Sequence, residues 1–413
     1  MAQNVSSERA VTAEVPLLTR ARSVLMVVLL LWLLVSTTLH SALSPAPGVT
    51  GIDFKCFYLA SERLAHGKPL YLPLSDGMVG TYPYVYSPVL AVALLPLTHL
   101  SFQHALALWD VFMALCLIGS VALFMKAADC GVRDMTLVGA ILLVSFRSWP
   151  ATMNFSLGQA NFLLLLGICG IFLADRHDKF YVAAVLIALV SLVKLWLLGI
   201  ILYLIIRRAW KPAVFSVLLY AAIVCIAFTV VGWREWTNFH EVTSAIASQQ
   251  FGQLGSMQSI SGFARVHFSV NEQVQPLIDS ALARRVFVLA SFAGIFAGLL
   301  TLWKNPPQNS PYLKRLQLGL VILSVILMLP MAEMEYYVFA LPLIWGLLMV
   351  DSRTVGRTRL IAFYGAILVY LLFTRNWDPP SVLSMAFSRP KSLLVSVYFL
   401  GGAALWCLGL AAI

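Results

Sequence analysis

A series of long apolar runs constrains this chain more than any other feature of its sequence. A helix that crosses the hydrocarbon core of a bilayer needs about 20 mostly apolar residues. Runs of this kind recur from end to end, at 23–43, 84–100, 104–126, 135–151, 159–174, 180–206, 212–232, 285–303, 316–330, 335–350, 360–375 and 392–412. They predict an all-α polytopic membrane protein with about 12 transmembrane helices.

The composition agrees with this prediction. Of the 413 residues, 60% are hydrophobic and 11% are charged, whereas about a quarter of the residues of a typical soluble domain are charged. So little polar surface excludes a water-soluble enzyme, a disordered chain and a secreted disulfide scaffold. The six cysteines are dispersed and form no CxxC pair, so they indicate neither a metal site nor a disulfide framework.

The net charge of +10 arises mainly from basic residues at the ends of the apolar runs, which indicates membrane topology rather than nucleic-acid binding. Basic clusters after even-numbered runs, such as Arg207, Arg208 and Lys211, place these loops and the N-terminus in the cytoplasm. We therefore expect a multi-pass protein of the cell (inner or plasma) membrane. Residues 1–22 form its cytoplasmic tail, and residues 23–413 form a single integral membrane domain.

Two segments between the runs are too long to be simple connections, namely residues 44–83 and 233–284. The same assignment places both of them, and short loops such as 175–179, on the outer face of the membrane. Long loops commonly carry binding or catalytic residues. In the first segment, the apolar residues 54, 57, 58, 64 and 65 share one helical face, which predicts a short amphipathic helix lying on the outer membrane surface.

Asp53 stands at the start of this predicted helix. Aspartate is favoured as an N-cap residue, and the helix dipole stabilises a carboxylate at that position. A carboxylate held in a fixed direction at the membrane–water boundary is also suited to act as a general base. The sequence leaves both roles open.

Three tyrosines, Tyr82, Tyr84 and Tyr86, alternate with other residues at the end of the first long segment. Tyrosine rings can stack on the faces of sugars while their hydroxyl groups bond to sugar oxygens. Tyrosines are equally typical of the aromatic belt at a membrane interface. The pattern therefore predicts either a carbohydrate site or an interfacial belt.

Lys194 lies near the middle of the run 180–206. A lysine at the centre of a span costs about 2.5–3.5 kcal/mol, so it should face a partner or a cavity. Asp110, in the run 104–126, is a comparable charge of opposite sign. Lys194 therefore either pairs with Asp110 or forms an anion site for a phosphate. The amides at 158–161 are interpreted as helix-packing groups.

Motifs for soluble donors are absent from the sequence. It contains no GxGxxG pattern, no phosphate-binding loop, no HExxH motif and no cluster of metal ligands. These absences argue against ATP or a soluble nucleotide sugar as the donor, and we expect no cofactor and no metal.

Several short motifs, taken in order, make the chain resemble glycosyltransferase family 87, the polyprenol-phosphate-mannose-dependent mannosyltransferases. The resemblance rests on Asp53, Lys194, Arg265 and the motifs at 58–60, 67–71, 84–88, 158–161 and 258–262. One stretch departs from the family pattern. Many members carry Pro-x-Ser-Trp-x-His-His before a late helix, whereas here Glu335 and Tyr336 stand near the histidine positions.

The resemblance implies a GT-C-type fold with two long outer-face loops. It also implies transfer of a hexosyl residue, with mannose as the first candidate, from a polyprenyl-phosphate sugar to a glycolipid or glycan acceptor. The transfer would invert the anomeric carbon at the periplasmic or extracellular face, without a metal. Asp53 is the expected general base, with Glu335 and Glu333 as the next candidates, and Lys194 or Arg265 would stabilise the leaving phosphate. The expected substrate-binding residues are Tyr82, Tyr84, Tyr86, Gln258, Ser259, Glu335 and Tyr336.

Two other classes of protein compete with this prediction. A transporter or lipid flippase would use Lys194 and Asp110 along a translocation path, and would be favoured by paired broken helices or an inverted repeat, neither of which is evident in the sequence. A non-catalytic membrane scaffold would tolerate substitution of Asp53 and of the tyrosines.

Overall fold

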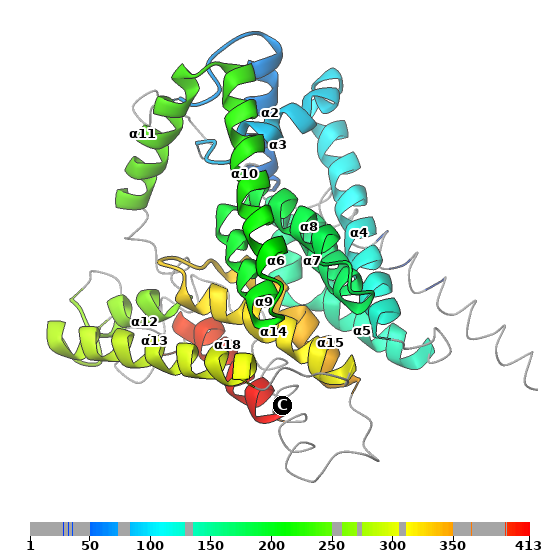
Figure 1. Ribbon diagram of the computed structural model, residues 1–413. Helices are drawn as coiled ribbons and strands as arrows, with labels where there is room; N and C mark the ends of the chain where they lie inside the picture. Colours follow the sequence, from blue (N-terminus) through cyan, green and yellow to red (C-terminus); the bar gives the residue numbers. More distant parts are fainter. Residues whose placement is uncertain are drawn as a thin grey trace, which may run out of the picture.

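The computed structural model describes residues 50–72, 83–128, 135–249, 258–270, 275–304, 311–349 and 395–413, together with positions 28, 32, 35, 365 and 393. Within these ranges its regular elements are helices (Figure 1), which confirms the all-α prediction. The predicted tail 1–22 and nearly all of the runs 23–43 and 360–375 lie outside the described residues.

The helices follow one another in a simple order. They are α2 (Ile52–Ala65), α3 (Pro88–Ala93), η2 (Leu95–His99), α4 (Phe102–Ala127), α5 (Met135–Arg147), α6 (Trp149–Leu157), α7 (Asn161–Arg176), α8 (Phe180–Val193), η3 (Leu195–Ile200), α9 (Ile201–Ile206), α10 (Trp210–Val231), α11 (Arg234–Gln249), α12 (Ile260–His267), α13 (Ala281–Lys304), α14 (Pro311–Met328), η6 (Met334–Ala340), α15 (Leu341–Leu348) and α18 (Val397–Ala411). Three described helices, α4, α10 and α13, are long and apolar enough to cross a membrane by length and composition. The total of about 12 spans stays a prediction.

The structure corrects the predicted span 180–206. Helix α8 ends at Val193, the backbone of the next residue, Lys194, is extended (φ −128°, ψ 104°), and η3 and α9 follow. Arg207, just after α9, forms a buried ion pair with Asp175, in the last turn of α7 before α8, with 2.9 Å between Nε and Oδ1. The two ends of the run therefore meet, and α8 contacts α9. The run folds back as a helical hairpin with Lys194 at its turn, so the predicted single crossing is wrong. The loops 175–179 and 207–211 lie at the same end of the molecule, not on opposite faces.

Extended backbone is tolerated at membrane depth only where protein buries it and its polar groups are paired. Both conditions hold at the turn of the hairpin. Lys194 is 5% exposed, its N–H donates to the carbonyl of Val190, and its carbonyl accepts from Leu197. The hydroxyl group of Ser87 donates to the carbonyl of Leu192. Apolar periodicity does not reveal such a break, because both arms of the hairpin are apolar.

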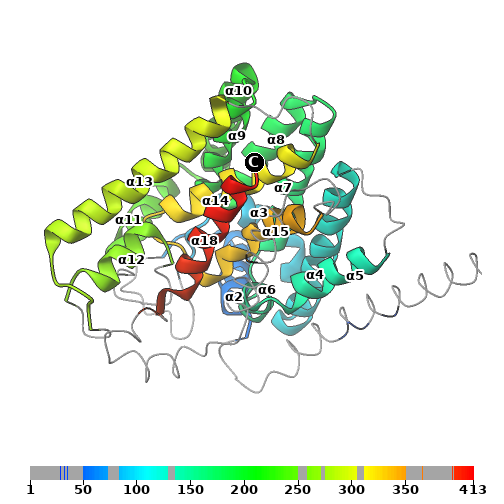
Figure 2. The same cartoon turned by 90° about the horizontal axis from the view of Figure 1, so that it is seen from below.

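The helices pack in two groups. In the first, α4 packs along α7, α7 along α8, and α8 along α10. A Cβ at Gly167 would lie 2.4 Å from the side chain of Val190, so glycine is what lets α7 and α8 approach. In the second, α14 lies beside α15 and α18, with α13 along their edge (Figure 2). Helix α10 exposes apolar side chains such as Leu218, Ile226 and Val230, which is typical of a surface that faces lipid.

The first long segment contains the predicted helix, which is confirmed as α2. Its apolar face packs against α3, η2, α4 and α6, with Phe54, Phe57 and Ala60 fully buried. The expectation that this helix lies on the membrane surface through its apolar face is therefore wrong, because that face is covered by protein.

The two long segments meet at the end of α10. The carboxylate of Glu235, in the first turn of α11, accepts hydrogen bonds from the N–H groups of Leu70 and Tyr71 at 3.1 and 3.2 Å. Figure 1 shows α2 and α11 near the same end of the molecule. The residues that follow α2 are thus anchored to the residues that follow α10.

Candidate active site

Asp53 lies in the first turn of α2, and its carboxylate makes no capping hydrogen bond. The N-cap position belongs to Gly51, which has a left-handed backbone (φ 69°), and no side chain caps the helix. The Oδ2 atom of Asp53 instead accepts a hydrogen bond from Nε2 of Gln159 at 2.7 Å. The N-cap interpretation of Asp53 is therefore wrong, and the carboxylate is directed by a residue 106 positions away.

The corner between α6 and α7 fixes both partners. Gly158 ends α6 in a left-handed conformation (φ 70°), and its carbonyl accepts from the indole N–H of Trp109 at 3.0 Å. The N–H of Gln159 donates to the carbonyl of Asn154 at 2.9 Å, and the N–H of Gly51 donates to the carbonyl of Ser156 at 2.7 Å. The start of α2 is thereby tied to the end of α6, which sets Asp53 against Gln159.

Lys194 contributes a buried positive charge from the turn of the hairpin. Its Nζ atom lies 4.1 Å from the centre of the Tyr336 ring, and the Trp196 ring stacks on the same tyrosine at 5.3 Å. Among the described residues, Nζ has no hydrogen-bond partner. A buried ammonium group needs compensating charge.

Three acidic side chains lie close enough to Lys194 to act on it. Glu335, Glu333 and Asp53 act electrostatically on Lys194, in decreasing order of strength, and none of them belongs to α4, the helix of Asp110. We call the four residues Asp53, Lys194, Glu333 and Glu335 the acidic cluster.

The segment before η6 brings the two glutamates into place. Glu335 is 5% exposed, and its carbonyl accepts from Nδ2 of Asn154 at 2.9 Å. The carbonyl of Ala332 accepts from the N–H of Gln258 at 2.7 Å. Asn154 of α6 and Gln258, two residues before α12, therefore hold the segment that carries Glu333 and Glu335.

The surroundings of Asp53 prepare it to exchange a proton near neutral pH. Burial and the nearby charge of Glu333 raise the pKa of Asp53 from its ordinary value of 3.8 to about 7, while Lys194 and the hydrogen bond from Gln159 lower it by less. A general base works best when its pKa lies near the working pH. A carboxyl group with this pKa is suited to exchange a proton at neutral pH.

Of the other predicted site residues, Tyr336 and Tyr86 lie beside the acidic cluster. The charge of Asp53 acts on both phenol groups, and the Tyr86 ring meets Phe57 edge-on at 4.8 Å. Together with Asp53, Lys194 and Glu335, they are the predicted residues that the fold brings together.

Tyr84 has partners within the protein instead. Its hydroxyl group donates to the carbonyl of Ser87 at 2.6 Å and accepts from the N–H of Ala91 at 3.1 Å, which fastens the start of α3. Tyr82 lies outside the described residues.

Gln258 and Ser259 also hold the fold together. The side chain of Gln258 donates to the carbonyl of Val395 and accepts from the N–H of Phe399. The hydroxyl group of Ser259 accepts from the N–H of Gly262 and caps α12. A substrate role for these two residues stays a prediction that their contacts do not favour.

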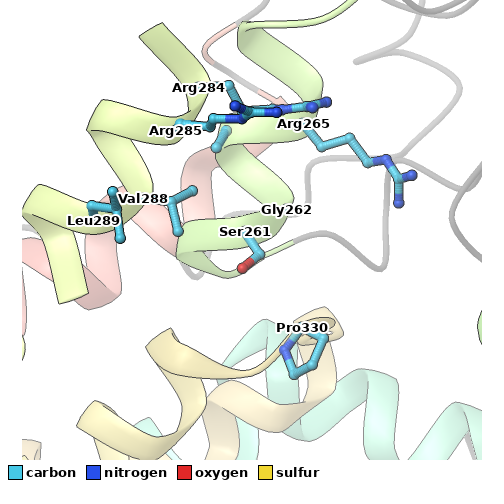
Figure 3. Close-up of a pocket in the computed structure, with 9 residues that line it drawn as sticks. Ser261, Gly262, Arg265, Arg284, Arg285, Val288, Leu289 and Pro330 are labelled. Atoms are coloured by element: carbon cyan, nitrogen blue, oxygen red, sulfur yellow. The ribbon is translucent and has the colours of Figure 1, made fainter. Parts of the chain in front are cut away.

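Arg265 lies outside the acidic cluster, in a pocket between α12, α13 and Pro330 (Figure 3). The resemblance to the family implied that either Lys194 or Arg265 would stabilise the leaving phosphate. The structure places Lys194 next to Asp53 and groups Arg265 with Arg284 and Arg285.

Sequence reasoning missed the role of Gln159, which it assigned to helix packing. Its partner is remote in sequence, and a single sequence contains no signal for that pairing. Among the described residues, no group of three or more His, Cys, Asp or Glu side chains is arranged to hold a metal ion.

The fold and the site together define an all-helical membrane protein with a buried centre of acidic residues and one lysine. Comparison with known proteins identifies its family. The model of glycosyltransferase family 87 matches residues 84–330, which is more than half of the chain, so this protein belongs to glycosyltransferase family 87. The matched range includes Gln159 and Lys194, whereas Asp53 and Glu333 lie outside it.

The proteins that are similar to the chain include a mycobacterial enzyme and a bacterial protein of known structure. The first is the polyprenol-phosphate-mannose-dependent alpha-(1-2)-phosphatidylinositol pentamannoside mannosyltransferase of Mycobacterium tuberculosis (strain CDC 1551 / Oshkosh). It is 27% identical over 216 residues, which are 51% of this chain and 49% of the relative, so the match spans about half the length of each protein. The second is the crystal structure of ArnT from Cupriavidus metallidurans bound to undecaprenyl phosphate, with a TM-score of 0.42 and 16% identity over 94% of this chain and 76% of the other.

Proposed function

We propose that this protein transfers a hexosyl residue, with mannose as the first candidate, from a polyprenyl-phosphate sugar to a hydroxyl group of a lipid or glycan acceptor. The main support for the proposal is the hydrogen bond that Gln159 donates to Asp53, close to Lys194. The chain that contains this arrangement belongs to a glycosyltransferase family. The donor and the sugar come from the name of the mycobacterial relative. The active site would face the periplasmic or extracellular side.

The reaction is a single displacement. The carboxylate of Asp53 takes the proton of the acceptor hydroxyl, and the acceptor oxygen forms a bond to the anomeric carbon. The bond between that carbon and the phosphate oxygen breaks, and its electron pair stays on the lipid phosphate. Attack from the side opposite the phosphate inverts the anomeric configuration.

Lys194 is a better candidate than Arg265 to face the leaving phosphate. The phosphate is bonded to the reacting carbon, so it must lie within a few ångströms of the base, and Lys194 is the cation that acts on Asp53. A cation held in a dry site stabilises the charge that develops on a leaving group. Tyr336, under the ammonium group, limits the directions from which a phosphate can approach.

The broken hairpin 180–206 is also a feature of transporters, in which interrupted helices line the substrate path. Here the break places Lys194 in the acidic cluster. The family to which the chain belongs is one of glycosyltransferases. Transfer of labelled sugar to an acceptor distinguishes the two classes, because a transporter or flippase moves the lipid without changing it.

The experiment compares wild type with Asp53→Asn in lipid vesicles that contain labelled polyprenyl-phosphate-mannose and a total lipid extract of the source organism. Loss of a positioned general base should lower the rate of transfer about 100- to 10,000-fold. Glu62→Gln is the matched control, because it removes a carboxylate from the same helix away from the cluster, and it should keep the wild-type rate. Thermal unfolding of all three proteins checks the fold.

The possible outcomes separate the parts of the proposal. Wild-type turnover by a folded Asp53→Asn protein would refute the assignment of the base. Absence of transfer by wild type with mannose, followed by transfer with another polyprenyl-linked sugar, would correct the sugar and retain the class.

A further inference from the structure

A second candidate site is the pocket that contains Arg265, between α12, the first turns of α13 and Pro330. The pocket has a volume of about 510 Å³, which is in the range of small-molecule sites. Figure 3 shows Arg265, Arg284 and Arg285 at one end of this pocket, and apolar side chains along its other walls. We call it the arginine pocket.

Positive charge is concentrated in the arginine pocket. Arg284 and Arg285 lie near the N-terminal end of α13, where the helix dipole disfavours cations. Arg265, in the last turn of α12, adds a third positive charge, and none of the described lining residues is acidic. The guanidinium group of Arg284 donates to the hydroxyl oxygen of Ser269 at 3.0 Å, which orients it. Guanidinium groups match phosphate oxygens in geometry and charge, so the pocket is suited to a phosphate group.

One wall of the arginine pocket continues into an apolar surface. That wall consists of side chains of α13, whose composition is that of a membrane span. Next to the arginines, α13 exposes more than half of the area of Leu282, Val286, Leu289 and Phe296. A surface of this kind is typical of contact with hydrocarbon. A ligand that satisfies both parts of the surface has an anionic phosphate head and a hydrocarbon tail.

The arginine pocket is separate from the acidic cluster. The charges that act on Asp53 are those of Glu333 and Lys194, and no residue of the acidic cluster lines the pocket. The occupant therefore needs no group that reacts. Phospholipids of the surrounding bilayer have the required head and tail, and anionic ones are attracted to basic pockets between membrane helices.

The walls of the arginine pocket are nevertheless linked to the acidic cluster through the backbone. Pro330 is three residues before Glu333. The N–H of Gln258, two residues before α12, donates to the carbonyl of Ala332 at 2.7 Å. A phosphate that bridges α12 and α13 would restrict the movement of α12, and through Gln258 the movement of the segment that carries Glu333.

Going beyond the proposed function, we propose that the arginine pocket binds an anionic phospholipid of the bilayer as a ligand that is not a substrate. The lipid phosphate binds the guanidinium groups, and its acyl chains lie along the exposed apolar side of α13. The bound lipid stabilises the packing of α12 against α13, because it binds the folded protein only. The stability of the protein, and with it the rate of transfer, therefore depends on anionic lipid in the membrane.

The test compares wild type with the double variant Arg265→Gln/Arg285→Gln of the full chain. Both side chains are exposed, and their replacement keeps the hydrogen bond of Arg284. Lys211→Gln/Lys304→Gln is the matched control, because it removes two positive charges from exposed helix ends that do not line the pocket.

Two kinds of measurement are made on these three proteins. Native mass spectrometry measures the binding of dioleoyl phosphatidylglycerol, dioleoyl glycerol without a phosphate, inorganic phosphate and undecaprenyl phosphate. Thermal unfolding and the kinetics of sugar transfer are measured in bilayers of phosphatidylcholine, with and without phosphatidylglycerol.

We expect the double variant to bind dioleoyl phosphatidylglycerol at least about tenfold more weakly than wild type and the control, because two charge-assisted contacts are lost. Phosphatidylglycerol should raise the unfolding temperature and the transfer rate of wild type and the control, and should change neither in the double variant. In phosphatidylcholine alone, the variant should unfold no earlier than wild type, because it lacks repulsion between the arginines.

Several outcomes would overturn the proposal. Equal binding of phosphatidylglycerol by all three proteins, or an equal gain in unfolding temperature, would show that the arginines do not bind the lipid. Equally tight binding of dioleoyl glycerol would show that the apolar surface acts alone. Earlier unfolding of the variant in phosphatidylcholine would make the arginines structural, and binding of inorganic phosphate alone would indicate an adventitious ion only.

The kinetics separate a bilayer lipid from a substrate. A rise in the donor KM of the double variant, with weaker binding of undecaprenyl phosphate, would assign the pocket to the donor and overturn the proposal. A rise in the acceptor KM that is independent of phosphatidylglycerol would do the same for the acceptor. If wild type transfers no sugar, the proposed function fails, whereas binding and unfolding still decide whether the pocket takes an anionic phospholipid.

Discussion

At the scale of single residues, the ionisation of Asp53 should govern the rate. Only the carboxylate can accept the proton of the acceptor, and burial with the charge of Glu333 raises its pKa to about 7. The rate of transfer should therefore be low at pH 5.5, rise about tenfold for each pH unit below pH 7, and level off above it. Initial rates measured between pH 5.5 and 8.5 show this rise, which is the acidic limb of the pH profile.

Removal of the hydrogen bond from Gln159 tests whether the acidic limb of the pH profile comes from Asp53. The bond favours the charged form of Asp53, so in Gln159→Leu the limb should move to higher pH and the plateau should fall, because the carboxylate is no longer oriented. A rate that does not change with pH in wild type, or a limb at the same pH in both proteins, would speak against Asp53 as the titrating base.

At the scale of elements, the site depends on how closely α2 approaches the corner between α6 and α7. A Cβ at Gly158 would lie 2.6 Å from the Cβ of Phe54 in α2, and the backbone of Gly158 is left-handed. Gly158→Ala should destabilise the protein by about 1–3 kcal/mol and should lower the transfer rate more than its stability explains, because α2 carries Asp53. Unfolding in denaturant and transfer rates below the unfolding transition measure both effects.

Gly294→Ala is the control for this prediction. Gly294 lies within α13, and a Cβ there would meet no atom of the described structure within 4 Å, so the substitution should be neutral or stabilise the helix by up to about 1 kcal/mol. Equal effects of the two substitutions would show that the contact between α2 and the corner does not position Asp53.

The same elements show how far the sequence predicts this molecule. Apolar runs and the amphipathic pattern of 52–65 predict most of the helices, because burial and periodicity are local properties. They do not predict the turn at Lys194, because both arms of the hairpin are equally apolar and the ion pair that closes it joins residues 32 positions apart. The site follows the same rule. Asp53 and Lys194 stand out locally as charges in unusual places, whereas Gln159 becomes meaningful only when the fold brings it to Asp53.

At the scale of the whole molecule, the hairpin changes which loops share a face of the membrane. The ion pair between Asp175 and Arg207 places the loops 175–179 and 207–211 at one end. Helix α10 has 22 residues and is about 33 Å long at 1.5 Å per residue, which matches the hydrocarbon core of a bilayer. Its far end leads to Glu235, which binds Leu70 and Tyr71. Residues near 68 should therefore lie on the opposite face from both short loops.

Labelling of introduced cysteines in intact cells tests this arrangement. Lys68, His177 and Lys211 are exposed, and each is replaced by cysteine in turn. A membrane-impermeant maleimide should label Lys68→Cys from outside, and should label His177→Cys and Lys211→Cys only after the cells are opened. Wild type, with its own six cysteines, gives the background. If run 180–206 crossed the membrane once, His177→Cys and Lys211→Cys would differ in accessibility, and this result would refute the hairpin. If Lys68→Cys were labelled only in opened cells, the hairpin would stand and the active site would face the cytoplasm, where the acceptor would have to be sought.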